Sequence, residues 1–265
     1  MRYTLRISYN GSDFYGWQRQ PGTRTVQGEI ERALSIFLGN EIPVTGAGRT
    51  DTGVNAVNYL AHFDLPDGCS LNDAKNFLYK INAILPKGIT VHEVREAGPD
   101  FHARFSALSR EYHYFIHRKK DPFMENFSWY CRYPLDLEKM NAAARNLLGR
   151  HDFSCFEKKG GNNLTSICTI SEAVWETWLP PHVSVLGYPC GREDFLMFRI
   201  RADRFLRNMV RAIVGTLVEV GRGRRSPEWT AGLLRDGDRS AAGESVPGNA
   251  LFLSRIEYAD ENGGL

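Results

Sequence analysis

One short stretch of the chain combines an arginine and an aspartate with three glycines: Gly46-Ala47-Gly48-Arg49-Thr50-Asp51-Thr52-Gly53-Val54-Asn55-Ala56. Glycine supplies positive φ angles and lets another backbone come close. An apolar segment leads into the stretch and an alternating one leads out, which predicts a tight loop between two strands. Loops on rigid scaffolds carry function disproportionately, so Asp51 and Arg49 are the first candidates for chemistry.

Asp51 has three interpretations at this point. A loop aspartate most often caps a turn through its own side chain. Asp51-Thr52-Gly53 also spells the motif of aspartic proteases, but those enzymes need two carboxylates that share a proton, and no second Asp-Thr-Gly occurs here. An arginine two residues away favours an ionised carboxylate over a shared proton. The third interpretation is a catalytic carboxylate that acts in its ionised form.

Basic residues gather in two later segments. Between residues 201 and 225 there are seven arginines: Arg201, Arg204, Arg207, Arg211, Arg222, Arg224 and Arg225. Basic and aromatic side chains also interleave between residues 101 and 120, among them Arg104, Phe105, Arg110 and Tyr112. Arginine with interspersed aromatics suits phosphate backbones and unstacked bases, although a charge run is more often a solvated face. The pattern favours RNA binding without excluding that alternative.

Composition limits the class of protein. The chain has 265 residues, 42% of them apolar and 24% charged, and its formal net charge is +2, so any basic surface must be local. Its five cysteines are widely spaced, with neither a close zinc-binding pair nor a disulfide framework. The N-terminus has no apolar signal core, and no run approaches the roughly 18 apolar residues of a membrane helix. We therefore expect a cytoplasmic protein with free thiols.

The residues with chemistry must be positioned by strands and helices. Period-two alternation predicts strands at residues 3–9, 57–65, 89–94, 107–116, 168–178, 195–202 and 251–258. Helical spacing predicts helices at 26–37, 71–85, 137–148 and 205–220, and a last one opened by Ser226-Pro227. The expected caps are Thr25, Ser70 with Asp73, and Asp136. Arg207 and Arg211 would share one helix face, and residues 160–163 are predicted to form a flexible tip.

The order of strands and helices is similar in two parts of the chain. This predicts an α+β fold of two similar halves, 1–104 and 105–265, each with an antiparallel, RRM- or ferredoxin-like sheet that carries helices on one face. Joined side by side, the halves would leave an open face with an active-site cleft. The N-terminal half would carry the aspartate loop, and the C-terminal half a tyrosine-containing strand and a basic helix.

Gly48 to Ala56 closely resembles the G-R-T-D-x-G-V-H-A signature of the TruA-type tRNA pseudouridine synthases. Other segments are similar to further motifs of that family in the same order: Tyr9 to Gln18, Arg104 to Tyr114, His151 to Phe156, Met209 to Leu217, and the apolar pair Leu251 and Leu253. Six ordered segments are far more specific than one loop motif.

The resemblance implies an enzyme that isomerises uridine to pseudouridine at positions 38, 39 and 40 of the tRNA anticodon stem-loop. It implies no cofactor and no metal, and a homodimer in which the tRNA spans both subunits. On the matching positions, Asp51 would be the catalytic carboxylate and Arg211 its cationic partner. The competing hypothesis is a non-catalytic RNA-binding protein on an RRM-like scaffold.

The resemblance also implies roles for residues that would contact the substrate. Tyr112 would stack on the extruded uracil, Arg49 would fill the gap that the base leaves, and Leu253 would form a wall of the pocket. Further candidates, for contacts with the RNA backbone, are Arg204, Arg207 and Arg110.

The chain departs from the family pattern at three positions. Asn55 stands where the family usually has histidine, Ala250 where it has glycine, and Cys168 where a basic residue is expected. Asparagine still donates and accepts hydrogen bonds. We expect these changes to affect details of tRNA docking more than the reaction.

Overall fold

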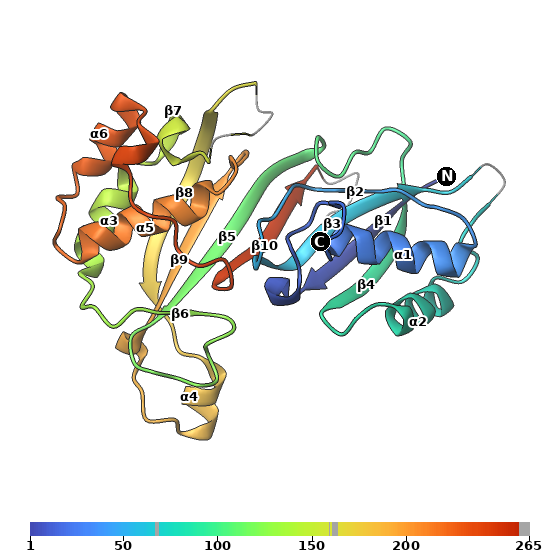
Figure 1. The fold of residues 1–265 in the computed structure, drawn as a ribbon, viewed down its shortest axis with the longest axis horizontal. Helices are drawn as coiled ribbons and strands as arrows, with labels where there is room; N and C mark the ends of the chain where they lie inside the picture. The colour runs from blue at the N-terminus through green and yellow to red at the C-terminus, as the bar shows by residue number, and fades with distance from the viewer. Residues whose placement is uncertain (67–68, 159, 161–163, 260–265) are drawn as a thin grey trace. The chain divides into compact units, whose positions relative to one another are not determined.

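A computed structural model of the chain describes residues 1–66, 69–158, 160 and 164–259 (Figure 1). The chain divides into two compact units, the first formed by Met1–Arg110 with Phe252–Leu265 and the second by Glu111–Leu251. The predicted division at residues 104 and 105 therefore differs from the observed one. The closing strand belongs to the first unit because Tyr258 packs on Phe101 and Ala103 there.

The strands of the first unit follow the order β4-β1-β3-β10, and β2 also pairs with β3. Its strands are β1 (Arg2–Tyr9), β2 (Val44–Gly46), β3 (Asn55–Asp64), β4 (Ile89–Ala97) and β10 (Leu251–Tyr258). β1 pairs antiparallel with β3 and β4, but β10 is parallel to β3. The prediction of a purely antiparallel sheet is wrong for this pair. Parallel neighbours need a long connection, and the whole second unit lies between these two strands in the sequence.

Two helices cover one face of this sheet, α1 (Val26–Leu38) and α2 (Ala74–Ile84). The Phe77 ring of α2 lies 5.3 Å from that of Phe37 at the end of α1 and 6.4 Å from that of Phe63 on β3. The predicted cap Thr25 is confirmed, since its side chain accepts from the Gly28 amide. The predicted cap Ser70 is wrong, because α2 begins three residues later, where Asp73 accepts from the Asn76 amide.

The other face of the sheet is covered by residues 98–106. There the buried His62 ring accepts a hydrogen bond from the Ala103 amide, 3.1 Å from its Nδ1. Arg2 donates to the Phe101 carbonyl at 2.6 Å and pairs with Asp64 at 2.8 Å. The segment is therefore bound to the sheet by polar contacts as well as apolar ones.

His62 makes the stability of this unit depend on pH. Burial, with the charges of Arg2 and His102, lowers the pKa of His62 from 6.5 to about 4. Between pH 6.5 and about pH 4, the His62 ring binds a proton in the unfolded chain but not in the folded one. The stability that the neutral ring contributes is therefore present at pH 7 and is lost as the pH falls below 6.5. We expect wild type to lose about 2 kcal/mol more than His62→Gln between pH 7 and pH 5, measured by urea unfolding. Equal losses in the two proteins would contradict this assignment.

The strands of the second unit follow the order β5-β9-β8-β7. Its strands are β5 (Ala107–His117), which crosses the boundary between the units, β6 (Trp129–Tyr130), β7 (Gly149–Asp152), β8 (Ile167–Thr177) and β9 (Phe195–Ala202). Its helices are α3 (Leu137–Arg145), α4 (Pro181–Leu186), α5 (Met209–Gly221) and α6 (Trp229–Asp236). Short 3-10 turns of the chain are η1 (Gly11–Asp13), η2 (Ser154–Phe156), η3 (Arg192–Asp194) and η4 (Arg239–Ala241).

Several boundaries in this unit differ from the sequence predictions. α5 begins at Met209 rather than 205, because Asn208 has a φ of 64° that a helix cannot include. α6 begins at Trp229 and is not opened by Ser226-Pro227. α4 forms where Pro180 and Pro181 predicted only an interruption, since proline is tolerated at the first position of a helix.

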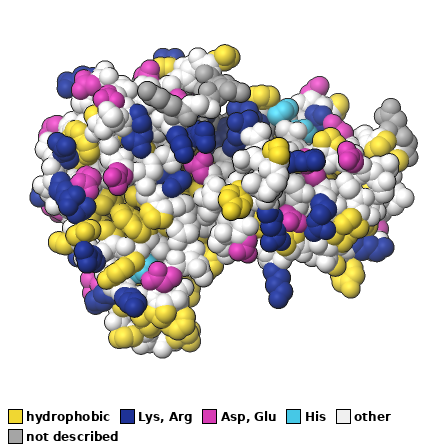
Figure 2. Space-filling model, in the orientation of Figure 1, with side chains coloured by type: hydrophobic (Ala, Val, Ile, Leu, Met, Phe, Trp, Pro, Cys, Tyr) yellow, Lys and Arg dark blue, Asp and Glu magenta, His cyan; other side chains and the backbone are white. Residues whose placement is uncertain are grey.

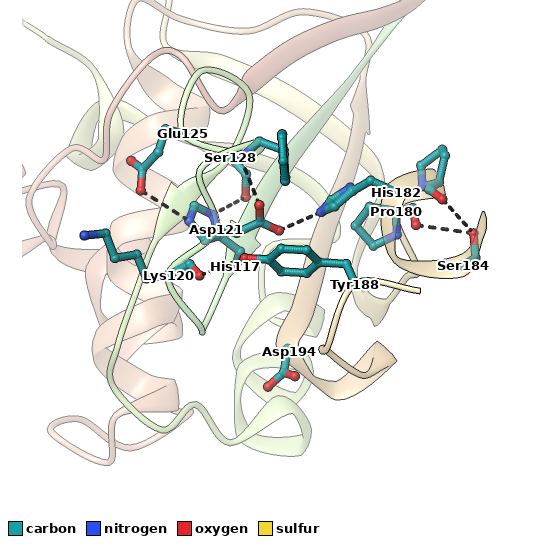
Figure 3. Close-up of polar contacts among 12 residues, drawn as sticks. His117, Lys120, Asp121, Glu125, Ser128, Pro180, His182, Ser184, Tyr188 and Asp194 are labelled. Carbon is teal, nitrogen blue, oxygen red and sulfur yellow. Dashed lines mark hydrogen bonds and ion pairs between the residues drawn. The ribbon is translucent and has the colours of Figure 1, made fainter. Parts of the chain in front are cut away.

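α4 is held to the unit by a buried carboxylate (Figure 3). Asp121 is fully buried, and its Oδ2 lies 2.7 Å from Nε2 of His182 on α4. Its Oδ1 accepts from the Phe123 amide. Such a satisfied pair fixes the position of a short helix that has little propensity to form alone.

The structure confirms that strands and helices are mixed in both units, whereas the RRM-like arrangement of two similar halves stays a prediction. All five cysteines are free. Within the described part of the chain, no helix is both long enough and apolar enough to cross a membrane. Of the predicted flexible tip at 160–163, all but Gly160 lies outside the described residues.

Candidate active site

The Asp51 loop connects β2 to β3, as the sequence predicted. The Asp51 carbonyl accepts a hydrogen bond from the Val54 amide at 3.1 Å, which closes a tight turn. Gly53 in this turn has a φ of 79°, a conformation that favours glycine. Asp51 is half-buried and Arg49 is exposed, so both side chains can be reached from solvent.

The residue before Asp51 is anchored to two other segments of the unit. The buried Thr50 Oγ1 lies 2.8 Å from the Tyr9 hydroxyl at the end of β1. The Thr50 carbonyl accepts from the Trp17 amide at 3.1 Å. The backbone that carries Asp51 is therefore held by contacts that do not use its carboxylate.

Two glycines outside the loop allow the chain to pass directly against it. A Cβ at Gly16 would lie 2.5 Å from the Thr50 carbonyl oxygen, and one at Gly11 would lie 2.2 Å from that of Val54. Any side chain at either position would displace the aspartate turn. Sequence reasoning missed these two roles, although both glycines lie in the Tyr9 to Gln18 segment that resembles a family motif.

Asn55, the departure from the usual histidine, has a structural contact. It is 1% exposed, and its Oδ1 accepts from the Gly11 amide at 2.8 Å. The amide side chain thus joins the start of β3 to the segment that packs against the loop.

Aromatic residues support the beginning of the loop. The Tyr59 ring lies 4.1 Å from that of Trp17 and 5.7 Å from that of Tyr9. The Tyr59 hydroxyl donates to the Gly48 carbonyl and accepts from the Gly48 amide. Because Gly48 and Thr50 are both held, the exposed Arg49 between them projects from a fixed backbone.

Two further predicted site residues lie beside this loop. Leu253 of β10 is 2% exposed and pairs with Ala56, directly after the loop. Arg110 donates from Nη2 to the Ala47 carbonyl at 3.4 Å and also to the Arg104 carbonyl. The Arg110 guanidinium thus connects the loop to the start of β5.

Arg211, in the second unit, is held in place by the segment that follows η4. Its Nε donates to the Val246 carbonyl at 2.7 Å, and its own carbonyl accepts from the Val246 amide at 3.3 Å. The Tyr114 hydroxyl donates to the next carbonyl, that of Pro247, at 3.1 Å. A Cβ at Gly215 would lie 1.8 Å from the Glu244 oxygen, so this glycine is needed for the segment to cross α5.

Tyr112 and the remaining arginines also belong to the second unit. The half-buried Tyr112 ring meets that of Phe205 edge-on at 5.1 Å. Arg204 donates to the Thr165 carbonyl at 3.2 Å, whereas Arg207 is exposed. Since Arg207 precedes α5, the prediction that it shares a helix face with Arg211 is wrong.

Much of the predicted basic charge is used inside the second unit. Arg201 pairs with Glu111, and Arg222 and Arg224 pair with Glu219. Burial would raise the pKa of Glu111, but the Arg201 hydrogen bond and charge bring it below its ordinary value. Figure 2 shows the same mixture, with Lys and Arg side chains interspersed with Asp and Glu. The local excess of positive charge is therefore smaller than the sequence count indicates.

Cys168 occupies a position where no phosphate contact can form. The side chain is fully buried on β8, and burial raises the pKa of its thiol to about 12. A basic side chain there would have to enter the core. The structure thus replaces the expected contact with a neutral, packed residue.

The predicted site residues are divided between the units. Asp51, Arg49, Leu253 and Arg110 belong to the first and are grouped around one loop. Tyr112, Arg204, Arg207 and Arg211 belong to the second.

Comparison with known proteins gives a consistent result. Residues 6–106 and 143–259 match a family described as tRNA pseudouridine synthase. The chain is 44% identical over 260 residues to tRNA pseudouridine synthase A of Bacteroides thetaiotaomicron, covering 98% of this chain and 91% of that protein. It is 39% identical over 263 residues to the Bacillus subtilis protein of the same name, covering 97% and 99%. The family match includes the Asp51 loop and Arg211 but not Arg110 and Tyr112.

Proposed function

Because the chain belongs to the tRNA pseudouridine synthase family, we propose that it converts uridine to pseudouridine at positions 38, 39 and 40 of the tRNA anticodon stem-loop, with Asp51 as the catalytic carboxylate. Isomerisation of uridine in tRNA is the activity of this enzyme family. The observation that carries the assignment of Asp51 is its half-buried place on a loop whose backbone is anchored through Thr50 and Val54.

The reaction needs an ionised carboxylate. The C1′–N1 bond breaks, the base turns, a C1′–C5 bond forms, N1 gains a proton and C5 loses one. Asp51 either attacks C1′, as in retaining glycosidases, or attacks the base, or stabilises positive charge that develops on the sugar. In all three cases the negative charge does the work. Arg211 is the cationic partner proposed for this carboxylate.

The target base must leave the stack before it reacts. Arg49 is long and planar, and it fills the space that the uracil vacates. Tyr112 stacks on the extruded base, and its phenol assists removal of the C5 proton. Leu253 forms an apolar wall beside the end of the aspartate loop. Its pairing with Ala56 supports this placement.

The anticodon stem-loop, a homodimer and a cytoplasmic location are part of the same proposal. Arg204 and Arg207 contact the RNA backbone, and the exposure of Arg207 suits this role. Arg110 is the weakest of the three candidates because its guanidinium donates to carbonyls of its own unit.

The test uses the purified protein with tRNA transcripts in which each of the three uridines is replaced in turn by cytidine. Chemical mapping is expected to find pseudouridine at 38, 39 and 40 and nowhere else, and each replacement should remove only its own signal. Light scattering with and without tRNA measures the oligomeric state. A protein that binds the transcripts without converting them would instead fit the non-catalytic hypothesis.

A further inference from the structure

A second feature of the first unit is the turn His102–Ser106, which is closed by its own hydrogen bonds. The amides of Arg104 and Phe105 donate to the His102 Nδ1 at 3.2 and 3.3 Å. The Ser106 amide donates to the His102 carbonyl at 2.9 Å, and the Ser106 hydroxyl accepts from the His102 amide at 3.0 Å. These hydrogen bonds fix the backbone conformation of the turn.

The turn is also fixed to the core of the unit. Ala103 is fully buried, its amide donates to His62, and its carbonyl accepts from the Tyr258 hydroxyl at 2.7 Å. Arg110 holds the Arg104 carbonyl with the same nitrogen that reaches Ala47 of the aspartate loop. Movement of the turn is thus coupled to the sheet on one side and to the candidate active site on the other.

This fixed turn holds an aromatic ring in solvent. Phe105 is 76% exposed, although Ala103 in the same turn is fully buried. Its ring lies 4.4 Å from the His102 ring at an angle of 36° and 5.5 Å from the Arg104 guanidinium. A single exposed phenylalanine needs no explanation. A phenylalanine held on a rigid turn, with an imidazole and a guanidinium close to its ring, offers an exposed aromatic face for stacking.

Bases of unpaired RNA are the ligands that such a face suits. Aromatic rings stack on any base, and a neighbouring arginine contacts its phosphate or extends the stack. An apolar protein partner would not need the cation beside the ring. The connection through Arg110 places the face on the same unit and next to the loop that carries Asp51.

We propose that His102, Arg104 and Phe105 form a stacking platform for an unpaired base of the tRNA anticodon loop, adjacent to the uridine that reacts. This inference rests on the proposed function, because it takes the same RNA as ligand. The platform binds a neighbour of the target base and takes no part in bond making or breaking.

Substitution of Phe105 tests the platform through RNA affinity. We expect Phe105→Ala to raise the Kd for an anticodon stem-loop RNA about 5- to 150-fold, and Phe105→Trp to keep it near the wild-type value. Tyr79→Ala is the matched control, because Tyr79 is 77% exposed on α2 of the same unit, and it should leave the Kd unchanged. Fluorescence anisotropy measures the Kd, and thermal unfolding checks that each variant is folded.

Arg104 provides a second, independent measurement. If its guanidinium contacts phosphate, Arg104→Ala should reduce the slope of log K against log salt by about 0.7. Unchanged affinity in Phe105→Ala, or failure of Phe105→Trp to restore it, would overturn the platform. A changed oligomeric state with unchanged RNA affinity would mean that the face binds a second copy of the chain, which also overturns it.

These outcomes separate the platform from the proposed function. Wild type that makes pseudouridine while Phe105→Ala binds RNA equally well refutes only the platform. Wild type that binds RNA through Phe105 but makes no pseudouridine supports the platform and refutes the proposed function.

Discussion

Asp51→Asn is expected to lower the rate of pseudouridine formation by roughly 1,000-fold or more while leaving tRNA affinity within a few-fold of wild type. An amide can neither carry the negative charge nor form the covalent bond that the carboxylate offers. The loop should keep its shape, because Thr50 holds it through Tyr9 and Trp17, and the turn uses the Asp51 carbonyl. The effect should therefore appear in the chemical step.

Single-turnover rates and equilibrium binding, measured on the same stem-loop RNA, separate the two quantities. Asp51→Glu keeps the charge but moves it by one methylene, so it tests whether geometry matters as well. Asp100→Asn is the control, since Asp100 is an exposed aspartate in a turn of the same unit. Conversion by Asp51→Asn at a rate within tenfold of wild type would eliminate Asp51 as the catalytic carboxylate.

Arg211→Gln is expected to give the second largest effect, a loss of about 100- to 1,000-fold in the rate of conversion. The substitution removes the cation that the proposed mechanism assigns to the reaction. It also removes the hydrogen bond from Nε to the Val246 carbonyl, so a loss of about 1 kcal/mol of stability should accompany it. Rates must be compared below the unfolding transition of the variant.

Arg211→Lys distinguishes charge from position. Lysine restores the cation but cannot reproduce both the Nε contact and the planar group, so we expect only partial recovery. Arg235→Gln removes an exposed arginine from another helix of the second unit and should leave the rate unchanged. If Arg211→Gln reacts like this control, Arg211 has no role in the chemistry.

The features predicted correctly from the sequence depend on contacts between near neighbours. Thr25 and Asp136 were found as caps because each accepts an amide three residues ahead. The prediction of Ser70 as a cap is wrong because Asp73, three residues later, accepts from the Asn76 amide and begins the helix. Asn208 shows the same limit, since no local pattern revealed that its backbone turns left-handed before α5.

The features that were missed depend on segments far apart in the sequence. β10 pairs with β3 across the whole second unit, and this pairing placed the closing strand in the first unit. Arg201 and Glu111 are 90 residues apart, so counting charge over residues 201 to 225 overestimated the local positive charge. Once the chain has folded, an acidic side chain from a distant segment pairs with Arg201 and reduces the net positive charge around it.

For the candidate site, the sequence by itself determined which residue types are present and in what spacing, and this was enough to single out Asp51 and its family. The tertiary structure decided how the aspartate loop is held. Tyr9 reaches Thr50 from 41 residues away, and Gly11 and Gly16 allow a second segment to pass against the turn. These contacts depend on distances between residues that are far apart in the sequence, and folding alone sets those distances.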